Sequence, residues 1–141
     1  MKVFLSHAQS DSGLALELAK NLQRRGLRVF NPDEDIAPGD NWALKIGEAL
    51  QESDFIVFLL TPGAMDQEWL RKEFEFALGS KRHENRVFTV FVGPTLEVSH
   101  DVPWILMKLP HLQLESAADL KHAAKEIASQ FSIREESSSN A

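Results

Sequence analysis

The sequence contains no cysteine, which excludes disulfide bonds and metal sites built from thiolates. It also has no apolar run of membrane-spanning length and no N-terminal apolar stretch of signal-peptide length. With Lys+Arg 15 against Asp+Glu 21, the formal charge is -6, and no basic stripe interrupts this balance. These absences argue against nucleic acid or a membrane surface as the main partner, and we expect a cytoplasmic protein.

The motifs of several common sites are missing as well. The first expected strand is not followed by GxGxxG, and the chain has no GxxxxGK[ST], GxSxG or HExxH. A phospho-acceptor domain would need acids at the ends of the first and third strands, where Ser6-His7 and Leu60-Thr61 stand instead. The histidines are scattered singly, so we expect no metal site and no cofactor.

What the sequence does contain is a regular alternation of short apolar strands and amphipathic helices. The alternation predicts a flavodoxin-like α/β fold, a five-stranded parallel sheet with helices on both faces. One domain over residues 1–131 accounts for the pattern, followed by a polar tail, 132–141, that we expect to be disordered. The expected strands are 2–6, 27–30, 55–60, 86–92 and 111–114. One expected helix begins after Ser10–Ser12 and another after Asp40, and two more cover 66–78 and 117–131.

A parallel sheet of this kind places its ligand crevice at the carboxyl ends of the strands. The segments that reach this edge are 6–10, the loop 31–40, 61–65 and 93–96. His7 is the histidine in that position, and it is either a ligand contact or a half-buried residue that caps a loop.

In the expected helix 66–78, DQEWLRKEFEFAL, one carboxylate differs from the others. At about 100° per residue, Leu70, Phe74 and Leu78 form an apolar stripe, and most charged side chains gather opposite. Glu73 falls at about -60° from Leu70, inside the apolar arc. A carboxylate there is paired with a cation, desolvated, or facing a pocket.

Three segments, in this order and spacing, resemble the TIR (Toll/interleukin-receptor) domain family over about residues 2–131. They are VFLSHAQSD at the first strand, GLRVFNPDEDIAPGDNW at the second strand and its loop, and DFIVFLLTPGAMDQEWLRKEFEFAL at the third strand and following helix. The resemblance implies one of two activities. Many TIR domains are adaptors that associate with other TIR domains, whereas members in bacteria, in plants and in one animal axonal protein cleave NAD.

The NAD-cleaving members resemble one another in a Glu four residues after a Trp, a pattern that Trp69 and Glu73 match. The leading hypothesis is therefore an NAD nucleosidase of a bacterial immune or effector module, with Glu73 catalytic and NAD as substrate. Cleavage passes through an oxocarbenium-like state, and nicotinamide leaves as a neutral molecule, so no general acid is required. One carboxylate can orient the ribose and stabilise the developing charge, and the acceptor, water or adenine, decides between hydrolysis and cyclisation.

The same resemblance implies further substrate contacts in the first turn, in the loop and at the start of the next helix. These positions are Ser6, His7, Ala8, Asp33, Ile36, Trp42 and Trp69. For Trp42, packing on the core is an equally good interpretation.

The resemblance also implies partners: other copies of the domain through TIR–TIR contacts, and a fused or separate sensor module. The alternative to the enzyme is a non-catalytic association module with complementary charged faces. A third interpretation is an enzyme like the nucleoside deoxyribosyltransferases, which share the fold and a catalytic Glu.

Overall fold

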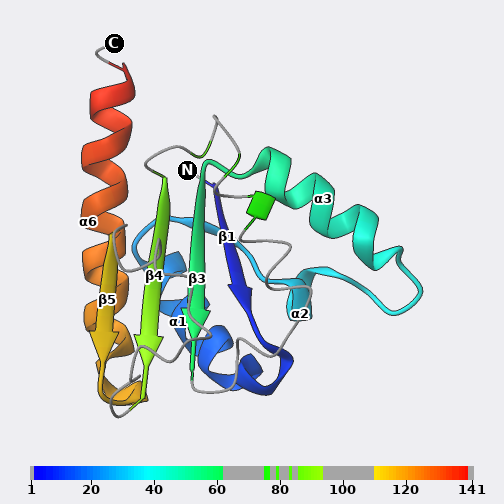
Figure 1. The fold of residues 1–141 in the computed structure, drawn as a ribbon, viewed down its shortest axis with the longest axis horizontal. Helices are drawn as coiled ribbons and strands as arrows, with labels where there is room; N and C mark the ends of the chain where they lie inside the picture. Colours follow the sequence, from blue (N-terminus) through cyan, green and yellow to red (C-terminus); the bar gives the residue numbers. More distant parts are fainter. Residues whose placement is uncertain are drawn as a thin grey trace.

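The computed structural model describes residues 2–61, 75–76, 79, 83, 86–93 and 110–139. Five parallel strands form one sheet in the order β2-β1-β3-β4-β5, and the arrowheads of β1, β3, β4 and β5 point the same way in Figure 1. This arrangement confirms the predicted fold class. The strands are β1 (Lys2–His7), β2 (Arg28–Phe30), β3 (Phe55–Leu60), β4 (Val87–Val92) and β5 (His111–Leu114).

The described helices cover both faces of the sheet. Helices α1 (Ser12–Arg24) and α6 (Leu120–Ser139) pack together on one face, and α3 (Trp42–Glu52) lies on the other (Figure 1). The described residues also form three short helical turns: η1 (Gln9–Asp11), α2 (Pro32–Asp35) and η4 (Ala117–Asp119). In the described part of the chain, no helix is both long and apolar enough to cross a membrane.

The central strands are buried on both sides, which explains their uninterrupted apolar sequences. All six residues of β3 and all six of β4 are buried. Alternate residues of β3 point to opposite faces, so Phe55 and Val57 join the core under α1 and α6, whereas Ile56 and Phe58 join the core under α3. The two apolar layers fix the register of the sheet that positions the site.

The end of α1 follows from the glycine at position 26. Gly26 has φ 88, a left-handed conformation in which a side chain would be strained. Its amide donates to the carbonyl of Gln23 at 3.0 Å, and the amide of Leu27 donates to the carbonyl of Leu22 at 3.2 Å. These two bonds form a Schellman motif, which ends the helix.

Three expectations about local structure were wrong. The stretch 31–40 is not wholly a loop, because Asn31 accepts a hydrogen bond from the Asp33 amide and starts the turn α2, with Pro32 at its first position. Asn41, rather than Asp40, caps α3 through its bond from the Leu44 amide.

The tail is also not disordered over residues 132–139, because α6 continues to Ser139. Extending an existing helix adds one hydrogen bond for each residue that is fixed, so the helix outlasts the apolar pattern that ends at Phe131. The domain boundary at residue 131 stays a prediction.

Candidate functional site

The strand order of the sheet marks one place for a ligand. In the order β2-β1-β3-β4-β5, the direction of winding reverses between β1 and β3, and the crevice of such a sheet lies outside the carboxyl ends of these two strands. His7, the last residue of β1, is paired with Leu59 of β3. The residues after β1 and β3, and those after the neighbouring β2, therefore converge on this edge.

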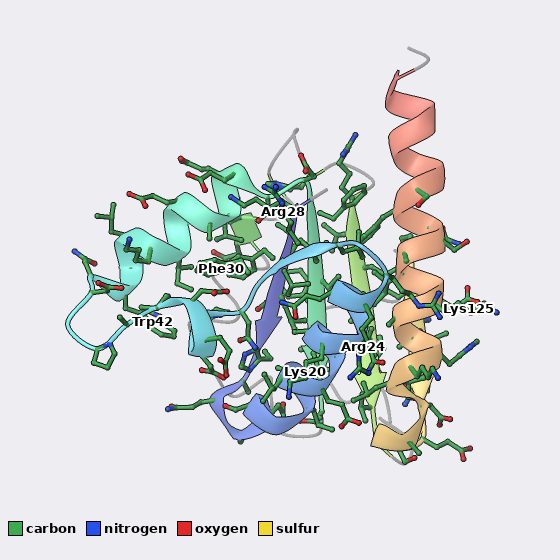
Figure 2. All side chains as sticks on the ribbon, turned by 180° about the vertical axis from the view of Figure 1, so that it is seen from behind. Lys20, Arg24, Arg28, Phe30, Trp42 and Lys125 are labelled. Atoms are coloured by element: carbon green, nitrogen blue, oxygen red, sulfur yellow. The ribbon has the colours of Figure 1, made fainter. Side chains whose placement is uncertain are left out.

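A cavity of about 350 Å³ lies beside the end of β1. Its described walls come from four elements that are separated in sequence: β1, η1, α2 and the first residue of α3. The residues that line it are His7, Gln9, Pro32, Asp33 and Trp42. Trp42 is 46% exposed, so its ring belongs to the wall of the cavity rather than to the core. Figure 2 shows Trp42 beside the loop that leads into α3.

The structure brings together three of the site residues expected from the sequence: His7, Asp33 and Trp42. Ser6 and Ala8, on either side of His7, are buried and are not among the lining residues, and Ile36 is half-buried away from the lining. The two remaining expected residues, Trp69 and Glu73, lie outside the described residues.

His7 is the best-connected side chain of this site. It is 3% exposed, and each of its ring nitrogens faces an oxygen. Nδ1 lies 2.8 Å from the carbonyl oxygen of Ala8, and Nε2 lies 3.0 Å from Oδ1 of Asn31. The carboxylate oxygen Oδ2 of Asp33 is 3.3 Å from the same Nε2. The ring thus joins the end of β1 to the start of α2.

Asn31 organises the other side of this contact. Its side-chain oxygen accepts a hydrogen bond from the backbone amide of Asp33 at 3.2 Å, and its backbone amide donates to Oδ2 of Asp35 at 2.9 Å. The two bonds tie the first turn of α2 together in the manner of a capping box. Asn31 is 3% exposed, so the turn is held from within the protein.

A second contact links the residues that follow β1 and β3. The hydroxyl of Thr61 donates to Oδ2 of Asp11 at 2.7 Å. Asp11, within the segment Ser10–Ser12 after which the helix was expected to begin, occupies the N-cap position of α1, but its side chain makes no capping bond and accepts from Thr61 instead. The two segments on either side of the switch point are therefore joined by a charge-assisted hydrogen bond.

Sequence reasoning missed Asn31, Gln9 and Pro32 as residues of the site. The Asn-Pro pair was a usable signal, because an N-cap Asn followed by Pro and acids is typical of a helix start. That signal predicts the turn, but it does not predict that His7 reaches it, because this contact depends on β1 and β2 being neighbours. Across the described residues, no group of three or more His, Cys, Asp or Glu side chains is placed to hold a metal ion.

Comparison with known proteins agrees with this architecture. The family model for the TIR domain matches residues 3–130. An NAD(+) hydrolase, TcpA, of Theionarchaea archaeon is 32% identical over 98 residues, which cover 67% of this chain and 30% of that protein. Human Toll-like receptor 1 is 26% identical over 99 residues, which cover 68% of this chain and 13% of the receptor.

Among solved structures, the metazoan TIR-STING receptor of C. gigas, in complex with 2',3'-cGAMP, superposes with a TM-score of 0.73 at 19% identity. The match covers 89% of this chain and 39% of that chain, and at this identity it supports the fold alone. The chain thus spans less than a third of the length of the archaeal hydrolase and a small part of the Toll-like receptor. The sequence match over residues 3–130, together with the strand order, shows that this chain belongs to the TIR domain family.

Proposed function

We propose that this TIR domain cleaves NAD at the bond between nicotinamide and ribose, releasing ADP-ribose or a cyclic isomer of it. The observation that carries the proposal is the cavity of about 350 Å³ at the switch point of the sheet. Its volume lies within the range of small-molecule sites, roughly 300–1,000 Å³. The 32% identity to a protein named as an NAD(+) hydrolase supports NAD as the ligand.

In this proposal the described walls of the cavity bind the dinucleotide. The half-exposed indole of Trp42 offers a flat face on which a base can stack. The side chain of Asp33, which is 29% exposed, can accept hydrogen bonds from ribose hydroxyls. The buried side chains of Ser6 and Ala8 would act through the shape of the backbone on either side of His7.

The reaction itself is assigned to Glu73, in register with Trp69. Positive charge develops at the anomeric carbon as nicotinamide departs, and a carboxylate aimed at that position lowers the barrier. Losing one such electrostatic contact costs about 100- to 1,000-fold in kcat in enzymes that stabilise charge in this way.

The test compares two isosteric changes that lie two residues apart in the sequence. Glu73→Gln removes the proposed carboxylate, and Glu75→Gln removes an exposed carboxylate two residues away. Purified wild-type protein and both variants are incubated with NAD at high protein concentration with a crowding agent, and nicotinamide and ADP-ribose products are separated by chromatography. We expect Glu73→Gln to lose about 100-fold or more in rate and Glu75→Gln to stay within about twofold. Equal turnover by the wild type and Glu73→Gln would refute the assignment.

The separation of surface charge favours a second candidate function, a TIR–TIR association module without catalysis. Figure 2 shows four basic side chains on the face formed by α1, β2 and α6, and none of them makes a salt bridge to another described residue: Lys20, Arg24, Arg28 and Lys125. The turn α2 carries three successive acids, Asp33 to Asp35. Basic side chains on α1, β2 and α6 and acids on α2 offer two copies complementary groups for a head-to-tail contact.

Light scattering at low and high salt tests this candidate. Association that weakens with salt, is lost in Arg24→Glu, and is accompanied by no NAD loss would favour an adaptor. Association together with NAD loss would favour an enzyme activated by assembly. For either outcome we propose a cytoplasmic signalling or immune role under the control of a sensor in the same or a separate chain.

A further inference from the structure

The ring of His7 is surrounded by oxygen atoms that act as acceptors. The Ala8 carbonyl faces Nδ1 at 2.8 Å, and both Oδ1 of Asn31 and Oδ2 of Asp33 face Nε2, at 3.0 and 3.3 Å. A neutral imidazole carries one N–H and can donate to only one side. Both ring nitrogens can donate only when the ring is the imidazolium cation, so this arrangement of oxygens matches the protonated ring.

The orientation of the Asn31 amide decides between the two forms of the ring. In the observed orientation Oδ1 accepts from both His7 and the Asp33 amide, and Nδ2 is buried without an acceptor among the described residues. If the side-chain amide of Asn31 were turned over, Nδ2 could donate to Nε2 of a neutral His7. Oδ1 would then be buried in place of Nδ2, and the backbone amide of Asp33 would lose its acceptor. The carboxylate of Asp33 would also face the lone pair on Nε2.

The turned amide therefore still leaves one buried atom of Asn31 unsatisfied, loses the hydrogen bond from the Asp33 amide, and adds a repulsion between the carboxylate and the ring lone pair. The observed orientation, with a charged ring, is the better satisfied of the two. This conclusion follows from the two oxygens that face Nε2, Oδ1 of Asn31 and Oδ2 of Asp33, because Nδ1 already donates to the Ala8 carbonyl in either form.

We propose that His7 is a positioning residue that works as an imidazolium cation, holding Asn31 and Asp33 against the end of β1 and so fixing the α2 wall of the cavity. Loss of the ring proton turns Nε2 into an acceptor that faces two acceptors, and α2 is then released from β1. The consequence for NAD binding rests on the proposed function. The protonation of the ring and its effect on α2 do not.

Few charged groups of the described residues can pair with the ring of His7. Among the described residues, Asp33 is the charged group within reach of the ring. Asp35 on the same turn is held by the Asn31 amide, and Asp11 on η1 is held by Thr61. Glu34, which lies between Asp33 and Asp35 in α2, is exposed to solvent. It provides a matched control for Asp33, because it carries the same charge one residue away.

Nuclear magnetic resonance of the full chain tests the proposal directly. Selective ¹⁵N labelling of histidine reports whether each ring nitrogen of His7 carries a proton, and the amide of Asp33 reports the state of α2. At a single near-neutral pH we expect a proton on both ring nitrogens of His7, and His7→Gln should shift the Asp33 amide resonance, because the contact between the ring and α2 is lost. A ring with a bare Nε2 would overturn the proposal.

Two substitutions separate the carboxylate contact from a general effect of charge. In Asp33→Asn the Nε2 resonance of His7 should change, because the ring loses the carboxylate 3.3 Å away, whereas in Glu34→Gln it should change much less. Equal shifts in the two variants would show that the Asp33 contact does not hold the ring. Both substitutions conserve size at the surface, so the measurement does not depend on a variant that unfolds.

The effect on the reaction is read separately. If NAD is cleaved, His7→Gln should raise KM about tenfold while kcat stays within about threefold, since the wall of the cavity and not the reacting carboxylate is disturbed. A loss confined to kcat would contradict a positioning role. Absence of NAD cleavage in the wild type would refute the proposed function and leave the resonance measurements as the test of His7.

Discussion

Two asparagines cap helices in this domain, and replacing each with alanine tests how the site is held together. Asn31 caps α2 from inside the protein at 3% exposure, and Asn41 caps α3 at the surface. Either substitution removes a side-chain oxygen that accepts from a backbone amide. Only Asn31→Ala also removes the acceptor that lies 3.0 Å from His7.

The expected losses follow from these contacts. A lost N-cap costs about 1 kcal/mol, and this is the whole effect expected for Asn41→Ala. Asn31→Ala adds a lost hydrogen bond to a charged ring, about 1.5–3 kcal/mol, for a total of about 2.5–4 kcal/mol. The loss of unfolding free energy should therefore differ between the two variants by at least about 1.5 kcal/mol. Because both variants lose a helix cap of the same kind, this difference reports the bond to His7.

Urea denaturation followed by circular dichroism measures both free energies of unfolding, with the slope m checked for constancy. In a thermal scan each kcal/mol should lower Tm by about 3–4 °C in a chain of this size. The reasoning is refuted if the two variants lose the same free energy within about 0.5 kcal/mol. A double-mutant cycle with His7→Gln then gives the coupling energy itself, which a neutral bond would leave below about 1.5 kcal/mol.

Two further predictions concern stability and use the same assay. Gly26→Ala should cost about 1–2 kcal/mol because φ is 88 there, whereas Gly47→Ala, inside α3 with nothing within 4 Å of the new methyl group, should stabilise by about 0.5–1 kcal/mol. The same sign at both glycines would contradict this account. Phe131→Ala should cost about 3–5 kcal/mol because the ring is 1% exposed and stacks at 3.9 Å on Phe55, whereas Leu44→Ala, at a residue 56% exposed, should change stability by less than about 0.5 kcal/mol.

The sheet could be predicted from the sequence because its signals are local. Runs such as residues 55–60 are apolar at every position, and a strand buried on both faces requires this. The cap at Gly26 was equally readable, since a single residue type satisfies the backbone there. The extension of α6 to Ser139 could not be predicted, because the polar residues that continue the helix beyond its packed part have no apolar periodicity to mark its end.

The site was predicted in position but not in connectivity. His7 was singled out because it ends a strand, and that reasoning needs only the fold class. Its partner Asn31 is 24 residues away, and they meet because β1 and β2 are neighbours in the sheet. Asp11 shows the same limit, since its bond to Thr61 spans 50 residues and competes with the local cap that the sequence favours.

The two edges of the sheet have a consequence for how copies of this domain can meet. The edge strands are the shortest: β2 has three residues and includes the exposed Arg28, and β5 has four, with His111 and Gln113 exposed. Short, polar edges offer few free backbone groups to a strand from another molecule and disfavour growth by sheet extension. If copies of this domain assemble, we therefore expect the contacts to be made by side chains on helices and loops, where single charge changes can alter them.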